Sequence, residues 1–155
     1  MLTIAQAETE AQINEARSLF REYEAALGLD LCFQGFEEEL AKLPGKYAKP
    51  CGRLLLAFSD ERVAGCIAMR KLEEGICEMK RLFVRDEFRG QKVGVQLIEK
   101  LIEKARKEKY KRMRLDTFPA KMEKAVQLYE SYGFRSIGPY YDNPNEGVLF
   151  MELNL

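Results

Sequence analysis

The chain of 155 residues is long enough to bury the core of one domain, and 46% apolar with 32% charged residues is typical of a globular protein. Lysine plus arginine equals aspartate plus glutamate at 25 each, so no bulk charge favours a nucleic acid or an anionic membrane. The chain has no histidine, which excludes histidine-based triads and histidine-ligated metals. Any general acid or base must therefore be glutamate, aspartate, tyrosine, lysine, cysteine or bound water.

The cysteine spacing and the N-terminal residues indicate the cellular compartment in which the protein is expected. Cys32, Cys51, Cys66 and Cys77 form no CxxC pair, so zinc or thioredoxin-like chemistry is not expected and reduced thiols are the default. The N-terminus turns acidic after a few residues, unlike a signal peptide, and no apolar run approaches about 18 residues. We therefore expect one cytoplasmic domain over residues 1–155, with no metal and no membrane partner.

The first half of the chain alternates strand and helix patterns. Apolar residues recur at steps of three and four from Ile13 to Leu27, which predicts a helix that Gly28 ends. The tetrapeptide at 59–62 favours a tight turn between two apolar runs and predicts a hairpin. The other elements expected here are a strand at Leu2–Ala5, a helix at Phe36–Leu43, and strands at Arg53–Phe58, Val63–Leu72 and Ile76–Val84.

The second half begins with a helical stripe from Val93 to Ala105 that runs into a charged end at Lys109. The elements expected after it are a strand at Arg112–Thr117, a helix at Lys121–Ser131, and strands at Phe134–Ile137 and Val148–Leu153. The order β-α-α-β-β-β-α-β-α-β-β predicts an α/β domain whose mixed sheet is mostly antiparallel and carries helices on both faces. The unit from 76 to 117 is expected to be a parallel crossover.

The most informative segment runs from Leu82 to Gly94, where an apolar strand end and a charged turn open a helix. A helix N-terminus leaves about four N–H groups unpaired and carries roughly half a positive charge, which suits phosphate. Gly90 and Gly94 allow close approach of the backbone, and Arg89 adds charge. An ordinary surface turn explains the same residues, and neither a Walker A loop nor a Rossmann fingerprint is present.

Two motifs make the pattern specific. Arg89-Gly90-Gln91-Lys92-Val93-Gly94 resembles motif A of the GNAT superfamily of N-acetyltransferases, [RQ]xxGx[GA], with Lys92 in place of the middle glycine. Downstream, Leu128-Tyr129-Glu130-Ser131-Tyr132-Gly133-Phe134 resembles motif B of that superfamily. The resemblance covers the whole chain. It implies the GNAT-like acyl-CoA N-acyltransferase fold and transfer of an acetyl group from acetyl-CoA to a primary amine.

The resemblance also implies a cofactor site. In the superfamily the strand before motif A splays from its parallel neighbour, and pantetheine amides pair with its backbone. That backbone belongs here to Leu82, Phe83 and Val84. An open strand edge needs partners, so a ligand that acts as a surrogate strand is chemically reasonable. The pyrophosphate is expected on the backbone amides of Gln91, Lys92, Val93, Gly94 and Val95, and Arg89 and Gly90 are expected to complete the cofactor-binding residues.

Two residues are candidates for proton transfer. Tyr129 matches the motif B tyrosine, which often protonates the departing thiolate in the superfamily; simple packing on the helix is the alternative. Glu78 is a candidate base, acting directly or through water, although a carboxylate paired with Lys80 explains it nearly as well. Cys77 has no group to activate it and is expected to be a structural thiol.

The acceptor site is expected beside the same strand. Because adjacent strand residues point to opposite faces, one of Lys80 and Arg81 is expected to reach the acceptor, and Arg81 is chosen as a carboxylate-binding group. Tyr140 and Tyr141 lie in a loop that should overhang the site and bind an amine; a rigid connection is the alternative. The basic residues of 104–114 are interpreted as a solvated helix end, not a nucleic-acid site.

The sequence therefore favours an acetyl-CoA-dependent enzyme that acts on a small-molecule amine by direct transfer. A protein or peptide acetyltransferase is the enzymatic alternative. A non-catalytic acyl-CoA sensor is the other alternative, since Lys92 replaces a motif glycine while the retained Tyr129 favours catalysis. A homodimer is a possible assembly for a member of this superfamily.

Overall fold

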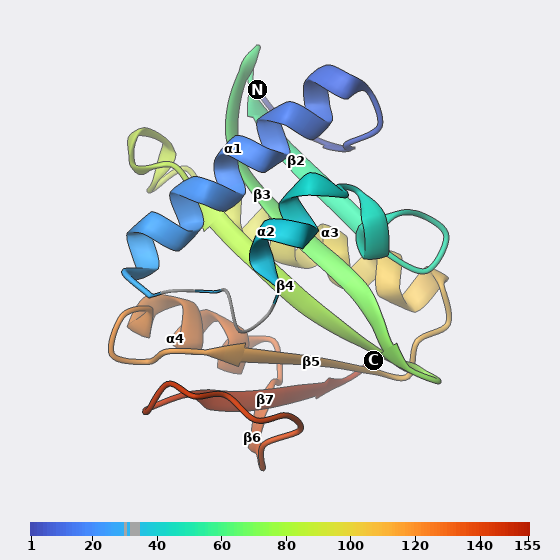
Figure 1. Cartoon of the computed structure of the whole chain (residues 1–155), viewed down its shortest axis with the longest axis vertical. Helices are drawn as coiled ribbons and strands as arrows, with labels where there is room; N and C mark the ends of the chain where they lie inside the picture. Colours follow the sequence, from blue (N-terminus) through green and yellow to red (C-terminus); the bar gives the residue numbers. More distant parts are fainter. Residues whose placement is uncertain (30, 32–34) are drawn as a thin grey trace.

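The computed structural model describes residues 1–29, 31 and 35–155 (Figure 1). Within these residues, strands form one sheet of seven in the order β1-β2-β3-β4-β5-β7-β6. Every pairing is antiparallel except β4 with β5, as the predicted crossover requires. The strands are β1 (Leu2–Gln6), β2 (Arg53–Ser59), β3 (Arg62–Glu73), β4 (Ile76–Val84), β5 (Arg112–Thr117), β6 (Arg135–Ile137) and β7 (Leu149–Asn154).

Helices cover both faces of this sheet. The helices are α1 (Glu10–Leu27), α2 (Phe36–Ala41), α3 (Val93–Lys107) and α4 (Glu123–Ser131), with single 3-10 turns at Gly45–Tyr47 (η2) and Asp86–Phe88 (η3). In Figure 1, α1 and α2 lie in front of the sheet and α3 lies behind it. No helix in the described part of the chain is both long and apolar enough to cross a bilayer.

Local chemistry sets the helix ends. A capping box between Thr9 and Gln12 starts α1, three residues before its first predicted apolar position, and Gly28 ends it in the left-handed conformation. Helix α4 begins at Glu123, two residues later than predicted. This difference leaves Lys121 and Met122 in the loop before the helix, where they reach a groove described below.

Strand alternation divides the core into two clusters. In β2, Leu54 and Leu56 pack with the apolar face of α1, while Leu55 and Ala57 pack with α3 on the other side. Tyr129 of α4 belongs to the α3 cluster. The two sides of the central strands are therefore different environments, each covered by its own helices.

The parallel pair β4–β5 is short and opens into a gap. Residues Ile76–Glu78 of β4 pair with residues Arg112–Arg114 of β5. On its other side, β5 pairs with β7 as far as Thr117. Beyond Glu78, β4 has no strand partner on its β5 side among the described residues. Figure 1 shows the two strands diverging from their common end. The predicted splay of β4 is thus present.

A bulge in β4 lies within this gap. Ala68 pairs with Lys80 and Cys66 pairs with Phe83, so Ile67 of β3 faces two residues, Arg81 and Leu82. Arg81 has a φ of 63°, in the left-handed region. The bulge places Lys80 and Arg81 on the same face, where Arg81 contacts α2 and Lys80 approaches Glu78. The expectation that these neighbours face opposite sides is therefore wrong.

Candidate active site

A groove of about 770 Å³ runs between the start of α3 and the start of α4. One wall contains the end of β4, the motif A loop and the first turn of α3; the other contains the loop before α4 and its first turns. The groove residues are Val84, Phe88, Arg89, Gly90, Lys92, Val93, Gly94, Val95, the segment 120–125 and Leu128. Most of the predicted cofactor residues therefore line one groove.

The charge of this groove suits an anion. Arg89, Lys92, Lys121 and Lys124 are cationic lining residues, against the carboxylate of Glu123. In the described chain no side chain caps the N-terminus of the 15-residue helix α3, so its first N–H groups remain available. Together these groups fit the pyrophosphate of an acyl-CoA, because phosphate binds where unpaired N–H groups and positive charge converge.

Lys92 occupies the position of the motif A glycine and keeps the conformation that a glycine would supply. Its φ and ψ are 60° and 28°, which is left-handed, and it is the residue that precedes α3. The replacement therefore preserves the turn at the cost of backbone strain, which is on the order of 1 kcal/mol for a residue with a Cβ. The turn is intact, and the ammonium group is added to the groove lining.

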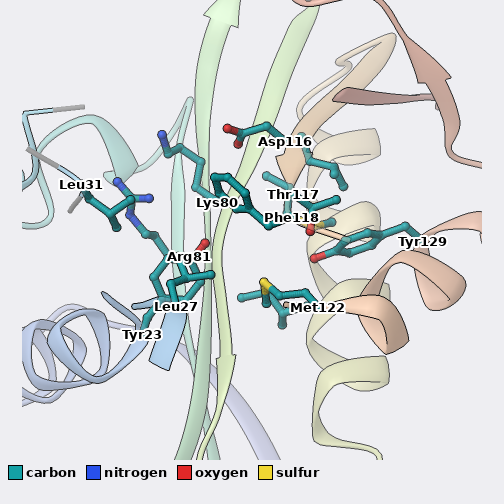
Figure 2. Close-up of a pocket in the computed structure, with 13 residues that line it drawn as sticks. Tyr23, Leu27, Leu31, Lys80, Arg81, Asp116, Thr117, Phe118, Met122 and Tyr129 are labelled. Carbon is teal, nitrogen blue, oxygen red and sulfur yellow. The ribbon is translucent and has the colours of Figure 1, made fainter. Parts of the chain in front are cut away.

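The gap between β4 and β5 adjoins the groove at Met122, which lines both. A cavity of about 30 Å³ lies in the gap, lined by Lys80, Arg81 and Leu82 from one side and by Asp116, Thr117 and Tyr129 from the other. In Figure 2, Tyr129 directs its hydroxyl from α4 toward β4, while Lys80 and Arg81 extend away to the opposite side. Leu82 therefore lines the gap, and the backbone of β4 is exposed to it.

The position of this open strand depends on one close contact. Gly65 of β3 lies against β4, where a Cβ would meet the carbonyl oxygen of Phe83 at 2.5 Å. No residue with a side chain can occupy that place without moving β4. The side chain of Phe83 packs in the α1 cluster, so any role of Phe83 in the site belongs to its backbone. Gln91 does not line the groove.

Tyr129 is suited to keep its proton. The residue is 5% exposed, and its ring packs against Phe134 with centroids 5.7 Å apart. Burial, with smaller contributions from Tyr23 and Asp116, raises the pKa of Tyr129 above its ordinary value. The phenol therefore stays protonated at neutral pH and can act as a donor in the gap.

Glu78 is ionised and fully engaged. It is 1% exposed, accepts hydrogen bonds from Arg70 Nε at 2.8 Å and Tyr140 Oη at 2.7 Å, and lies 3.9 Å from Lys80 Nζ. Burial raises its pKa, but Lys80, Tyr140 and Arg70 together outweigh burial and lower it below the ordinary value. The carboxylate is therefore a weak proton acceptor.

A second pocket, of about 220 Å³, opens on the α2 side of β4. Its lining combines β3, β4, the η2 turn and the loop before β7: Lys46, Arg70, Leu72, Glu78, Lys80, Tyr140 and Tyr141. The two tyrosines line this pocket beside the strands, with rings 5.5 Å apart, and Tyr141 donates a hydrogen bond to Asp116. Among the described residues, Lys80 alone lines both this pocket and the gap.

Arg81 does not reach this second pocket. Its guanidinium donates two hydrogen bonds of 3.0 Å to Glu39 of α2, and both side chains are almost fully buried. It also lies over the ring of Phe36, 5.2 Å from the centroid. The bidentate pairing with Glu39 occupies the Arg81 guanidinium, which was chosen from the sequence to bind a substrate carboxylate. Of the two neighbouring cations Lys80 and Arg81, Lys80 is the one that faces the pocket.

Sequence reasoning missed part of each lining. Lys121 and Lys124 complete the groove, and Lys46 and Arg70 complete the second pocket. The signal for Lys121 and Lys124 was present in their position next to motif B. No local pattern indicated Lys46 or Arg70, because the fold brings them to β4 from separate segments.

The splayed parallel strands beside a basic helix N-terminus define the acyl-CoA N-acyltransferase fold. The structure superimposes on a GNAT-family acetyltransferase of Staphylococcus aureus with a TM-score of 0.82, at 20% identity and 99% coverage of both chains. A proposed acetyltransferase of Salmonella typhimurium, solved with its cofactor acetyl-CoA, has a TM-score of 0.67 at 17% identity, with coverage of 99% of this chain and 93% of that one.

Sequence comparison places the chain in a family. Residues 13–134 match the Acetyltransferase (GNAT) family. An uncharacterised N-acetyltransferase of Schizosaccharomyces pombe is 38% identical over 99% of this chain and 95% of its own length. The N-acetylaspartate synthetase of Danio rerio is 33% identical over 71% of this chain and 39% of that longer protein. The chain belongs to the GNAT family, and it is an acetyl-CoA-dependent N-acetyltransferase.

Proposed function

We propose that this enzyme acetylates the primary amine of a small molecule by direct transfer. The observation that carries the proposal is the junction at Lys80, where the gap on the donor side and the pocket on the α2 side meet across one strand. A pocket of about 220 Å³ is below the roughly 300–1,000 Å³ typical of drug-sized ligands, which favours a compact acceptor.

The buried thiols support direct transfer. Cys77 is fully buried, and burial raises its pKa to about 12. Cys66 is also fully buried, and burial raises its pKa further still. A thiol in this state is a poor nucleophile at neutral pH, because the thiolate is the reactive form. An acetyl-cysteine on either residue is therefore disfavoured.

Each part of the site has a chemical task in this proposal. Bound acetyl-CoA would supply the acetyl thioester, held by the motif A groove and the open β4 backbone. The Tyr129 hydroxyl would donate a hydrogen bond to the departing sulfur and give it a proton, and the proton that the amine releases to water restores the phenol. Because Glu78 is ionised and engaged, we assign it to shaping the acceptor pocket through Tyr140 and Arg70, and we assign removal of the amine proton to water.

The experiment is release of CoA thiol from acetyl-CoA in the presence of a panel of amines, amino acids and short peptides. Tyr129→Phe is expected to lower kcat by about 10²–10⁴ while CoA affinity, measured by calorimetry, stays unchanged. Tyr132→Phe is the matched control, because its hydroxyl bonds Glu99 at the surface. Equal activity of the two variants would assign Tyr129 to packing. Acetylation of peptides in preference to every free amine would contradict the small-molecule acceptor.

The sensor alternative loses its main support in the structure. That alternative depended on Lys92 disrupting the phosphate turn, whereas Lys92 adopts a left-handed conformation, which glycine favours, directly before α3. Tight CoA binding without turnover on any member of the panel would favour the sensor again.

A further inference from the structure

The acceptor pocket carries more positive than negative charge. Its lining includes Lys46, Arg70 and Lys80, which supply three positive charges, and Glu78, which supplies one negative charge. Lys80 has an 8% exposed side chain, and that of Arg70 is 28% exposed, so two of these charges are largely shielded from water. Charges shielded in this way interact more strongly than exposed ones.

The negative charge of Glu78 is already used within the pocket. One carboxylate oxygen accepts from Arg70 and the other accepts from Tyr140. Glu78 therefore neutralises one of the three cations and leaves an excess.

The surroundings contain further charges. Arg81 pairs with Glu39, which also lies 3.5 Å from Lys46 Nζ, and Arg114 pairs with Glu152. Asp116 accepts a hydrogen bond from the neutral Tyr141 and approaches Lys80 from β5, so its negative charge offsets a second cation of the pocket. In the described part of the chain, the charged and titratable groups facing Lys80 are thus Glu78, Arg81, Arg70, Lys46, Glu39, Asp116, Tyr140 and Tyr141. Among these described residues, one positive charge remains in excess at the pocket.

Burial and the neighbouring cations act on both lysines. Burial, Arg81 and Lys46 lower the pKa of Lys80 to about 8, against the opposing effects of Glu78 and Asp116. Burial, Arg70 and Arg81 lower the pKa of Lys46, although Glu39 opposes them. A bound anion would reverse this effect by favouring the protonated lysines.

We propose that the acceptor is an amino acid, a primary amine with a carboxylate nearby, and that Lys46, Arg70 and Lys80 hold the carboxylate. The proposal rests on the proposed function and names its substrate class. With the carboxylate in the pocket, the amine faces the gap at the Lys80 junction, where the donor side begins. The same charge disfavours polyamines and other polycationic acceptors.

The test compares L-alanine, L-aspartate, L-alaninamide and putrescine at fixed acetyl-CoA, with CoA thiol release as the readout. Alanine and alaninamide differ in the carboxylate alone. The amine of alaninamide is less basic, so more of it is neutral at the assay pH, and a preference for alanine cannot come from amine ionisation. We expect kcat/KM for alanine and aspartate to exceed that for alaninamide by about 10- to 100-fold, the effect of losing a charged hydrogen bond.

Variants separate recognition from folding. Lys46→Met and Lys80→Met are expected to reduce the alanine-to-alaninamide ratio of kcat/KM about tenfold while leaving the KM for acetyl-CoA unchanged. Lys71→Met is the matched control, because Lys71 pairs with Glu74 and lies outside the pocket. A variant that is misfolded or generally less active would have a lower kcat/KM for both alanine and alaninamide, and the ratio of the two would not change. Unchanged ratios in both variants would overturn the assignment.

The pH dependence gives an independent readout. Protonated Lys80 attracts the carboxylate, so its contribution to the preference for alanine should fall as pH rises through about 8, the pKa of Lys80 in the free enzyme. The two amines also ionise differently over this range, so the preference of the unmodified enzyme is divided at each pH by that of Lys80→Met, which cancels amine ionisation. A quotient that stays constant from pH 7 to pH 9 would contradict the role of Lys80.

The outcomes distinguish this inference from the proposed function. Amine-dependent release that is equal or better with alaninamide or putrescine overturns the amino-acid acceptor and leaves small-molecule acetylation standing. Absence of release with every amine and amino acid overturns both together.

Discussion

Replacing Arg81 by methionine is expected to lower the free energy of unfolding by about 3 kcal/mol. The substitution removes the guanidinium that holds Glu39 and keeps an unbranched apolar side chain over Phe36. It leaves the left-handed backbone of the bulge as it is, because methionine has a Cβ just as arginine does. The loss therefore reports the buried charge that remains on Glu39.

The magnitude follows from the burial of the pair. The two hydrogen bonds are 3.0 Å each, and the side chains of Arg81 and Glu39 are 3% and 4% exposed. Removing one partner of a buried pair costs about 3–5 kcal/mol, because the other charge is left without compensation. Lys46 lies 3.5 Å from Glu39 and retains part of the interaction, so the lower end applies. For a domain of this size, that corresponds to about 6–12 °C in Tm.

The assay is urea unfolding followed by circular dichroism on the four proteins of a double-mutant cycle. Arg81→Met/Glu39→Met should return to within about 1 kcal/mol of the unmodified protein, because an apolar pair can replace a buried ion pair. Arg85→Met is the control: its bidentate partner Glu22 is 42% exposed, so a loss under about 1 kcal/mol is expected. A loss below about 1 kcal/mol for Arg81→Met, or additive single losses, would refute the reasoning.

Three further predictions concern backbone geometry and pH. Lys92→Gly should raise the free energy of unfolding by about 0.5–1 kcal/mol by removing left-handed strain, and calorimetry should show weaker CoA binding; unchanged affinity would place the ammonium outside the phosphate contacts. Gly65→Ala should weaken CoA binding and cost about 1–3 kcal/mol, because its Cβ would displace the Phe83 carbonyl; normal affinity would show that β4 tolerates the shift. The Arg81 pairing lowers the pKa of Glu39 in the fold despite burial, so its stabilisation is complete above the unfolded pKa of about 4.5 and is lost as pH falls. In urea titrations, the difference between the unmodified protein and Arg81→Met should therefore shrink as pH falls from neutrality to below 4.5, because without Arg81 burial raises the pKa of Glu39 and the variant takes up this proton first. A constant difference would contradict the pairing.

The element order and most residues of the groove at the start of α3 could be predicted from the sequence, because both depend on local signals. Hydrophobic periodicity located the strands and helices to within a few residues. Motif A located the N-terminus of α3, where the turn geometry follows from a short contiguous segment. Lys92 shows the limit of such motifs: its residue type departs from the pattern, while its backbone does not.

The acceptor side was harder to predict because it depends on contacts between distant segments. Period-two alternation assigned Lys80 and Arg81 to opposite faces, and the bulge that overturned this has no signature in the residue types around it. Glu39 was not considered as a partner of Arg81, since the two lie on different elements. Overhang by Tyr140 was expected, whereas its bond to Glu78 required the fold.

Strand β4 has a consequence for how such an enzyme can be re-engineered. Glu78 and Lys80 face the proposed acceptor pocket, while Leu82 and Val84 pack on the α3 side, and the bulge between them shifts the phase of the alternation. Lys80 also lines the gap, whereas Lys46, Arg70 and Glu78 line the pocket without lining the gap. Under the proposed function, positions 46, 70 and 78 can therefore be varied in a library while the residues of the gap and of the groove stay constant. New amine acceptors could then be sought without rebuilding the proposed cofactor site.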